Sequence, residues 1–484
     1  MSGDLEQPGP AQEQTSKIRI QFITRDTDHE LPAEASAPIL VATKFRRYAL
    51  STLINTLLDT PTPVPFEFLI LGQFLRTSIE DFLTANGISA ETTLTVEYVR
   101  ALIPPLHVAS FEHDSWVSAI DVLSGSSPAS IWTNNSPGVP SGQEKILSGS
   151  DDGLLRIWNM SSEVEAISSV SHNNHITNAK FLSPTRVVSA SFDRTIRLWK
   201  YESMPDFGPT STLTPSVELY GHKASVDSIA VHAPSSRLLS ASQDHTVGIW
   251  SSKKTDAPPA PQSLLPSSSN KRRKLNPNPN SVSQRGSLAL MTGHTASVTS
   301  VSFAPNDPTV AYSSSLDHTL RTWDLATRTL VDTRTTAHAL SCLTPLQDLG
   351  LVATGTDARS IILIDPRASA TAVSALTLRG HTGTVWALST DPSSAYGLAS
   401  GALDSTVRIW DVRAARPGSG GIGAPEVECV YTIERESGRG RKKPVRGDEV
   451  KVFGIVWDGE VGVVSAGSDK RVQVNRSPQG VRDS

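Results

Sequence analysis

One motif recurs along most of this chain, and it restricts the fold more than any other feature. Each strong copy has small residues before an Asp and ends, six residues after that Asp, in a Trp that closes an alternating apolar stretch. A weaker copy ends at Ile364, and a last copy starts at Asp469 and has Asn475 in the Trp position. An ordered repeat of this kind predicts an array of similar supersecondary units. The strong copies pair Asp152 with Trp158, Asp193 with Trp199, Asp244 with Trp250, Asp317 with Trp323, and Asp404 with Trp410.

The alternation inside each copy predicts β-strands joined by tight turns. Apolar residues at every second position, such as Ile196 and Leu198, place one face of a strand in a core. A single four-stranded unit cannot bury both of its faces, so the units have to stack around an axis. The sequence therefore predicts an all-β propeller of seven blades over residues 101–478.

The last unit is short, because the chain reaches Ser484 soon after its third strand. A blade without its outer strand would expose unpaired backbone groups along an edge. We expect the segment Leu106–Phe111, which lies upstream of the first unit, to supply the missing strand and close the ring.

A His, or a substitute for it, stands upstream of each unit. With the Asp and the Trp, this pattern resembles the WD-repeat family, which implies that His, Asp, Trp and a Ser or Thr form a hydrogen-bonded tetrad in each blade. The same residue types could suggest a hydrolase triad, but a nucleophile repeated in every unit is far less plausible than a scaffold. The weak copy has Ala358 at the turn position, so we expect an incomplete tetrad and the least well fastened blade there. The upstream positions are His113, His172, His222, His294, His338, His381 and, in the last unit, Gly447-Asp448.

A separate unit precedes the repeats. Its order is strand, strand, helix, strand, short helix, strand, which suits an α+β ubiquitin-like β-grasp domain over residues 17–100, after a disordered tail at 1–16. The strands are predicted around Ile18, Ile20 and Phe22, over 39–45, over Phe66–Leu71 before a turn at Gly72, and around Leu94, Val96 and Tyr98. The first helix carries Leu50, Leu53, Ile54, Leu57 and Leu58 on one face and ends before Pro61 and Pro63, and the second opens with a capping box at Thr77-Ser78-Ile79-Glu80.

The segments 66–70, 75–78 and 96–105 resemble the Notchless-like (NLE) domain. An NLE domain ahead of a seven-bladed propeller is similar to the family of ribosome-biogenesis WD-repeat proteins that form a heterotrimer with pescadillo and the block-of-proliferation WD-repeat protein. The resemblance implies a non-enzymatic assembly factor of the large (60S) ribosomal subunit, required for ribosomal RNA precursor processing, in the nucleus, nucleolus and nucleoplasm. It also implies that the NLE domain is the docking handle for the AAA ATPase Midasin, which releases the complex from the precursor particle.

The resemblance assigns a role to one acidic residue. Glu91, in the loop before the last strand of the domain, matches the family residue that offers its carboxylate to the metal held by Midasin. A hard divalent cation prefers carboxylate oxygen, so this chemistry is sensible. The alternative is that Glu91 is a solvated loop residue, as most exposed Glu are. Glu80, Asp81 and Glu97 are rival carboxylates, but we expect helix or strand positions to make them less able to protrude.

Two intervals between repeats are too long for a blade alone. The first excess, about 251–287, is rich in Ser, Pro and Asn, and the second covers 413–447. We expect both to be disordered insertions. The run Lys271, Arg272, Arg273 and Lys274 in the first is a candidate nuclear-import signal or RNA contact, or an ordinary solvated loop. The second insertion offers a possible ribosomal RNA contact through Arg439, Arg441, Lys442, Lys443 and Arg446.

Composition excludes several other classes of protein. Lys and Arg number 44 and Asp and Glu 48, so no global positive field favours nucleic acid or anionic membrane. Two cysteines, Cys342 and Cys429, cannot build a disulfide framework. Cys342 stands where an apolar inner-strand residue is expected, and Cys429 has no His near it in sequence, so neither is a candidate nucleophile. The polar first residues predict no signal peptide, and no apolar run is long enough for a membrane span. We expect a soluble intracellular protein.

The repeat accounts for most of the histidines, and none is left with the spacing of a zinc site. No phosphate-binding Gly-Lys-Ser or Gly-Lys-Thr motif is present. We therefore expect no cofactor and no metal bound by this chain alone. The alternative function is a WD-repeat substrate adaptor of a ubiquitin ligase, whose β-grasp domain would bind as a ubiquitin mimic through a hydrophobic sheet face and without metal.

Overall fold

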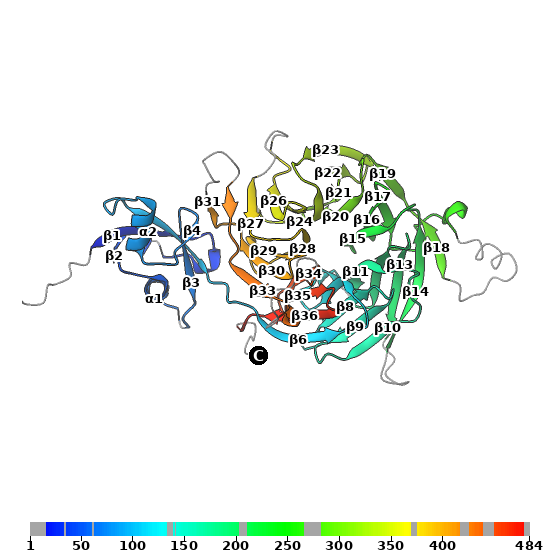
Figure 1. The fold of residues 1–484 in the computed structure, drawn as a ribbon, viewed down its shortest axis with the longest axis horizontal. Helices are drawn as coiled ribbons and strands as arrows, with labels where there is room; N and C mark the ends of the chain where they lie inside the picture. Colours follow the sequence, from blue (N-terminus) through cyan, green and yellow to red (C-terminus); the bar gives the residue numbers. More distant parts are fainter. Residues whose placement is uncertain are drawn as a thin grey trace, which may run out of the picture. The chain divides into compact units, whose positions relative to one another are not determined.

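The structure is a computed structural model of the 484-residue chain, and it describes residues 16–32, 35–60, 62–132, 139–140, 142–202, 211–265, 282–368, 375–416, 425–438 and 450–478. The chain divides into two compact units (Figure 1). The first comprises residues up to 103 together with 413–416, and the second comprises 104–412 and the residues from 417 onward. The boundary thus lies about three residues later than the sequence analysis places it.

The first unit is a mixed five-stranded sheet with two helices. Its strand order is β2-β1-β5-β3-β4, and the central strands β1 and β5 run parallel. Ile18, Ile20 and Phe22 alternate into the core, where they meet Leu50 and Ile54 of the first helix. The elements are β1 (Lys17–Ile23), a 3-10 helix (Thr27–His29), β2 (Ile39–Ala42), α1 (Arg47–Leu58), β3 (Phe66–Ile70), β4 (Gln73–Phe74), α2 (Ile79–Asn86) and β5 (Leu94–Arg100).

The second helix begins one residue later than predicted. Its N-cap is Ser78, whose hydroxyl accepts a hydrogen bond from the Asp81 backbone N–H at 3.2 Å, and the Asp81 carboxylate accepts one from the Ser78 backbone N–H. The predicted capping box of Thr77 and Glu80 is therefore wrong. The reason is burial: this register places Ile79, which is fully buried, on the core side of the first turn.

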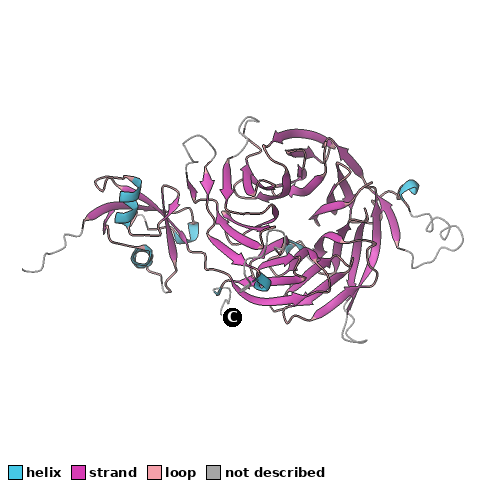
Figure 2. Cartoon of the chain, in the orientation of Figure 1, coloured by secondary structure: helices cyan, strands magenta, loops and turns pink. Residues whose placement is uncertain are grey.

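The second unit consists of four-stranded antiparallel runs, which we call blades, built almost wholly of strands (Figure 2). Within a blade each strand pairs with the next, and the fourth strand lies at the outer side of the ring (Figure 1). The strand bounds, blade by blade, are β7 (Val117–Leu123), β8 (Lys145–Ser150), β9 (Leu155–Asn159) and β10 (Val164–Ser168); β11 (Ile176–Ser183), β12 (Arg186–Ser191), β13 (Ile196–Glu202) and β14 (Ser211–Tyr220); β15 (Val226–His232), β16 (Arg237–Ser242), β17 (Thr246–Ser251) and β19 (Ala289–Thr292); β20 (Val298–Ala304), β21 (Asp307–Ser315), β22 (Thr319–Asp324) and β23 (Thr329–Thr335); β24 (Leu340–Leu346), β25 (Leu351–Thr356), β26 (Ser360–Ile364) and β27 (Leu376–Arg379); β28 (Val385–Thr390), β29 (Gly397–Ala402), β30 (Thr406–Asp411) and β33 (Tyr431–Glu434); and β34 (Val452–Asp458), β35 (Gly462–Gly467), β36 (Arg471–Arg476) and β6 (Leu106–Glu112).

The last of these blades, which we call the closing blade, confirms the predicted ring closure. Its outer strand is β6, which pairs antiparallel with β36 from Leu106–Arg476 to Glu112–Arg471. The two strands are separated by most of the chain, yet Phe111 lies with Val472 and Val474 in one buried cluster. No described helix, in this unit or the other, is long and apolar enough to cross a membrane.

Both predicted disordered insertions contain regular structure, so those predictions are wrong in part. In the first, β18 (Ser283–Gly286) pairs parallel with β14, and Gln262–Leu264 form a 3-10 helix. In the second, β32 (Glu426–Val427) pairs parallel with β27, and Glu436–Gly438 form a 3-10 helix after β33. A polar composition does not exclude these strands, because short edge pairings satisfy the backbone without burying much apolar surface. The remaining elements are α3 (Pro128–Ile131) and β31 (Ala415–Arg416).

Candidate functional site

Four blades carry the complete tetrad that the repeat predicts. In the β11–β14 blade, His172 Nδ1 lies 2.9 Å from Asp193 Oδ2 and its Nε2 lies 2.7 Å from Ser189 Oγ. The indole N–H of Trp199 donates to the same Ser189 Oγ at 2.8 Å. The other complete sets are His222, Ser240, Asp244 and Trp250; His294, Ser313, Asp317 and Trp323; and His381, Ser400, Asp404 and Trp410.

These tetrads are built for structure, and their burial argues against hydrolysis. Ser189 is fully buried, so no substrate reaches its hydroxyl. Burial lowers the pKa of His172 against the opposing effect of Asp193. Burial also disfavours the Asp193 carboxylate, but hydrogen bonds from His172, Thr195 and the Asn173 backbone hold the pKa of Asp193 well below its usual value. A neutral His hydrogen bonded to an ionised Asp thus links the segment before β11 to the turn between β12 and β13.

Three blades depart from the tetrad, and two of them keep the His. In the first blade, His113 Nε2 contacts Ser148 Oγ at 2.8 Å, but Asp152 pairs with Arg156 at 2.7 Å instead of with His113. The expectation of a full tetrad there is wrong, because the Arg156 guanidinium reaches the carboxylate. In the β24–β27 blade, His338 Nδ1 lies 4.0 Å from Asp357, and both side chains are half exposed. Ile364 stands in the Trp position and has no side-chain N–H to donate. These features confirm the predicted incomplete tetrad.

The closing blade replaces its His with Arg435. Its Nη1 lies 2.8 Å from Ser465 Oγ and its Nε 3.1 Å from Asp469 Oδ2, the Ser and Asp positions of the tetrad. Arg435 directly follows the outer strand of the preceding blade, as His222 follows β14 and Gly221. The prediction that Gly447-Asp448 substitutes for His is therefore wrong, and those two residues lie outside the described residues. The only sequence signal for Arg435 is its place after the alternating stretch Tyr431–Glu434.

Glu91 lies in an ordered, exposed loop between α2 and β5. The loop begins at Gly87, which caps α2 with φ +65°, a left-handed conformation suited to glycine. The Glu91 backbone N–H donates to Ser89 Oγ at 3.3 Å, and Thr92 Oγ1 donates to the Ser89 carbonyl at 2.9 Å. Within the described residues, the Glu91 carboxylate has no hydrogen-bond or ion-pair partner. It is therefore available to a ligand outside the chain.

The rival carboxylates are engaged within the first unit. Glu97 Oε1 lies 3.2 Å from Arg25 Nε, and Asp81 completes the capping box of α2. Glu80 is exposed but accepts a hydrogen bond from Thr43 at 3.4 Å. Of these four acidic residues, Glu91 alone is exposed and has a carboxylate without a hydrogen-bond or ion-pair partner among the described side chains.

Exposed aromatic side chains gather at the ends of three inner strands, and the sequence analysis missed them. In four inner strands the second residue is a Ser or Thr whose hydroxyl donates to the first carbonyl of the next inner strand. Trp386 and Phe453 take that position in β28 and β34. Trp116, just before β7, has its ring centroid 6.3 Å from that of Phe453. Trp116 and Trp386 are 50% and 48% exposed. The four hydroxyl donors are Ser118, Thr177, Thr299 and Ser341.

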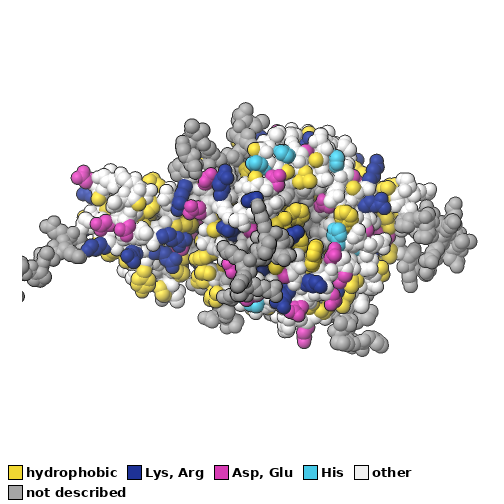
Figure 3. Space-filling view, in the orientation of Figure 1, with side chains coloured by type: hydrophobic (Ala, Val, Ile, Leu, Met, Phe, Trp, Pro, Cys, Tyr) yellow, Lys and Arg dark blue, Asp and Glu magenta, His cyan; other side chains and the backbone are white. Residues whose placement is uncertain are grey.

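We call Trp116, Trp386 and Phe453 the aromatic rim. A sequence signal for it existed, because Trp116 and Trp386 fall outside the Asp-to-Trp interval that explains the other repeat tryptophans. Buried tryptophans of the tetrads serve the core, whereas exposed tryptophans are the residue type that most often anchors protein interfaces. On the face of the molecule seen in Figure 3, basic and acidic side chains are interspersed.

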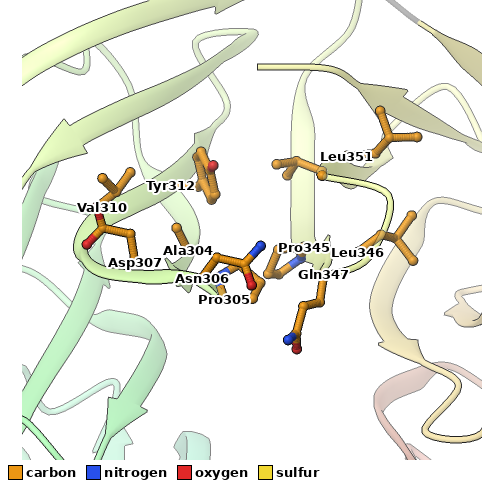
Figure 4. Close-up of a pocket in the computed structure, with 12 residues that line it drawn as sticks. Ala304, Pro305, Asn306, Asp307, Val310, Tyr312, Pro345, Leu346, Gln347 and Leu351 are labelled. Carbon is orange, nitrogen blue, oxygen red and sulfur yellow. The ribbon is translucent and has the colours of Figure 1, made fainter. Parts of the chain in front are cut away.

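A cavity of about 190 Å³ lies between the β20–β21 and β24–β25 turns (Figure 4). Its walls are mostly apolar and include Val310, Tyr312, Pro345 and Leu346. Burial raises the pKa of Tyr312, which keeps its hydroxyl protonated. Its one carboxylate, Asp307, is exposed and accepts a hydrogen bond from Thr309 at 2.6 Å. The described lining therefore offers no pair of groups for acid–base or nucleophilic chemistry.

The remaining predicted sites are placed as follows. Cys342 is buried, and Cys429 is half-buried with its Sγ 3.2 Å from Arg408 Nη1. Across the described residues, His, Cys, Asp and Glu side chains form no group of three that could hold a metal ion. The basic runs Lys271–Lys274 and Arg439 to Arg446 lie outside the described residues.

Comparison with known proteins agrees with both halves of this description. Residues 18–83 match the NLE (NUC135) domain, and residues 106–159, 164–200, 213–251, 285–324 and 373–411 match the WD domain, G-beta repeat. The first three strands of the weak copy, β24 to β26, and of the closing blade, β34 to β36, lie outside these repeat matches, consistent with their altered tetrads.

The chain is also similar over nearly its whole length to curated fungal proteins. It is 58% identical over 471 residues to "Ribosome biogenesis protein ytm1" of Aspergillus terreus, which covers 95% of this chain and 96% of that protein. The proteins of the same name from Aspergillus clavatus and Emericella nidulans are 57% and 58% identical, each with 95% of both chains covered. Two domain matches in the order that the structure shows, and identity at this level over the whole chain, place this protein in the family of the ribosome biogenesis protein ytm1.

Proposed function

We propose that this chain is a non-enzymatic assembly factor of the large (60S) ribosomal subunit that supports processing of ribosomal RNA precursors. The name of its relatives supports a role in ribosome biogenesis, and buried tetrads together with a cavity that lacks reactive pairs support a scaffold. In this proposal the second unit is a closed seven-bladed propeller, and the first is a ubiquitin-like domain whose parallel central pair β1 and β5 is typical of a β-grasp sheet.

The propeller scaffolds a heterotrimer with pescadillo and the block-of-proliferation protein. The aromatic rim supports this assignment, because Trp116 and Trp386 expose large apolar rings to solvent. Such exposure is unfavourable in a monomer and is typical of a protein-binding surface. The chain would act in the nucleus, nucleolus and nucleoplasm. Lys271, Arg272, Arg273 and Lys274 are its proposed import signal, and Arg439, Arg441, Lys442, Lys443 and Arg446 its proposed contacts with the ribosomal RNA of the pre-60S particle.

The NLE domain is the handle on which Midasin pulls to release the complex from the precursor particle. The observation that carries this part is the Glu91 carboxylate, exposed and without a partner among the described residues while its rivals are engaged. An open coordination position on a divalent cation accepts such an oxygen from a partner protein. Glu91 binds that metal only in trans, so the chain itself needs no resident metal.

The ubiquitin-ligase adaptor is less well supported by the first unit. The outward residues of β1 are Lys17, Arg19, Gln21 and Ile23, and all four are exposed, so three of the four are polar or charged. A ubiquitin mimic needs an apolar face at this sheet, and charged side chains on its central strand oppose that mode of binding.

The test is binding of the purified full-length chain to the metal-site domain of Midasin with Mg²⁺ present. Glu91→Ala should abolish binding, and chelation of Mg²⁺ should do the same to the unmodified chain. Glu80→Ala is the matched control, because Glu80 is also an exposed acid of this unit. Normal binding by Glu91→Ala, or binding that survives chelation, would sink the handle assignment. Mass spectrometry of gently purified complexes tests the rest: pescadillo, block-of-proliferation and pre-60S components support it, and cullin-type ligase subunits without them overturn it.

A further inference from the structure

The chain covers several outer edges of its own blades with parallel strands. The start of β14 pairs with β10, at Ala166–Ser168 with Ser211–Leu213, so the edge of the first blade is closed. The end of β14 is closed in turn by β18, and β27 is closed by β32. The added strands β18 and β32 come from the two long insertions and are only four and two residues long. Short parallel additions are thus the way in which this molecule protects an exposed edge.

Strand β23 is an outer edge of seven residues that no described strand covers. It pairs antiparallel with β22 on one side and lies at the outside of its blade (Figure 1). The uncovered edges β19 and β33 have four residues each. The edge of β6 is also long, but β6 begins close to the boundary between the two units, whereas β23 lies well inside the second unit.

The first half of β23 exposes two adjacent apolar side chains, whereas the covered stretch of β10 exposes one, Ile167. Leu330 is 41% and Val331 63% exposed. Val331 is the extra residue of a β-bulge opposite Thr322 and Trp323. The matching bulge residues of β10 and β14 are Glu165 and Ser216. A bulge normally helps to protect an edge strand against pairing with another chain. An exposed apolar Val at the bulge has the opposite effect and favours contact with a partner.

The second half of β23 is already engaged. Arg334 is buried, forms an ion pair with Asp332 and donates through Nη2 to the Pro366 carbonyl at 3.0 Å. The available edge therefore runs from Thr329 to Asp332, which is the length of β18.

We propose that this edge binds an extended segment of a partner protein, which pairs with β23 in the parallel direction and lays apolar side chains over Leu330 and Val331. Backbone hydrogen bonds would supply affinity and the two side chains specificity. We infer the parallel direction from the three outer edges of this molecule that are already paired with a parallel strand. The parallel direction also indicates which segment binds. Two copies of this chain related by a two-fold axis would pair their β23 strands antiparallel. A strand that pairs parallel with β23 therefore has to come from a different segment.

The experiment uses photo-crosslinking in the full chain within its native complexes. A benzophenone side chain is introduced at Thr329, Leu330 or Val331, one position at a time, and crosslinked peptides are identified by mass spectrometry. We expect all three positions to reach one short segment of one partner, in ascending order along that segment. Crosslinks to β23 of a second copy, crosslinks to RNA, reversed order, or the absence of protein crosslinks at all three positions would each overturn the proposal.

A variant series provides the second measurement. Val331→Lys places a charge on the edge and should reduce recovery of the crosslinked partner at least ten-fold. Val170→Lys is the matched control, because Val170 is 51% exposed and lies outside the strands. The control should leave recovery unchanged. Equal loss in both variants would show that surface charge, and not strand pairing, decides the contact, and it would count against the proposal. This outcome is independent of Glu91 and of Midasin.

Discussion

Arg435 and Asp469 form a bidentate ion pair inside the closing blade, with Nε 3.1 Å from Oδ2 and Nη2 2.5 Å from Oδ1. Both side chains are nearly inaccessible to solvent. Arg435 also donates to the Ser465 carbonyl and hydroxyl, so its charge is both paired and hydrogen bonded. The residue that would be the His of the closing blade belongs to the end of the preceding blade, and the pair therefore joins two neighbouring blades where the ring closes.

Removing Arg435 should destabilise the propeller strongly. Arg435→Ala leaves Asp469 buried without its counter-charge, and we expect a loss of about 3–5 kcal/mol in the free energy of unfolding. Denaturant unfolding of the full chain measures this. The control is Arg471→Ala, whose ion pair with Glu112 in the same blade is exposed and should be worth less than about 1 kcal/mol. Equal effects of the two changes would contradict the structural role of Arg435.

His113 should make the first blade sensitive to acid. Burial lowers the pKa of His113 from 6.5 to about 4. Between pH 6.5 and 4, His113 is therefore protonated in the unfolded chain but neutral in the folded chain. The free energy of unfolding falls as the pH drops through this range. The loss approaches about 3 kcal/mol at roughly 1.4 kcal/mol per pKa unit. His113→Gln should remove this part of the pH dependence, and a stability difference between the two proteins that stays constant from pH 7 to 4 would refute the assignment.

The β24–β27 blade should open more readily than its neighbours. It lacks the Trp donor, and its His338–Asp357 contact is long and solvated. Native-state hydrogen exchange reports local opening directly. We expect amides of β25 and β26 to exchange faster than those of β12 and β13, which belong to a complete tetrad. Slower exchange in β25 and β26 would show that packing outweighs the missing tetrad.

The two thiols should differ sharply in reactivity. Burial raises the pKa of Cys342 to about 12, so it stays a protonated, inaccessible thiol at neutral pH. Cys429 is half-buried and lies beside the Arg408 guanidinium. Alkylation with iodoacetamide at pH 8 should therefore modify one thiol in the native chain and two after denaturation. Modification of Cys342 in the native state would contradict its burial.

The aromatic rim should carry binding energy for the protein partner of the propeller. Trp386→Ala and Trp116→Ala should each weaken binding of the block-of-proliferation protein by about 2 kcal/mol or more, or roughly thirty-fold, the effect of losing an interface hot spot. Isothermal titration measures this. Tyr48→Ala removes another exposed ring, which lies in α1 of the first unit, and should change affinity little. Unchanged affinity in both tryptophan variants would place the interface elsewhere.

The repeat made much of the fold predictable. A fixed Asp-to-Trp interval with alternating apolar residues predicts strands, turns and their order, because those depend on local backbone chemistry. The closing strand Leu106–Glu112 was predictable for the same reason, since the last copy lacks one strand. The exposed loop position of Glu91 was predictable from its place between a helix and a strand, while its role rests on family resemblance.

The errors have physical causes that local patterns do not contain. The capping box moved by one residue because burial of Ile79 set the helix register. Asp152 pairs with Arg156 and not with His113, because two donors compete for one carboxylate. The insertions were assigned to disorder from composition, and edge pairing with β14 and β27 ordered their flanks.

The sequence by itself determined the repeating strands, the tetrad residues of the regular blades and the separate NLE domain, because each depends on residues a few positions apart. Only the tertiary structure decided that Arg435 takes the His position beside Ser465 and Asp469, some thirty residues further on. It also decided that Trp116 meets Phe453 and that β23 keeps an uncovered edge. These features depend on which blades become neighbours, and the closure of the ring sets that for residues far apart in the chain.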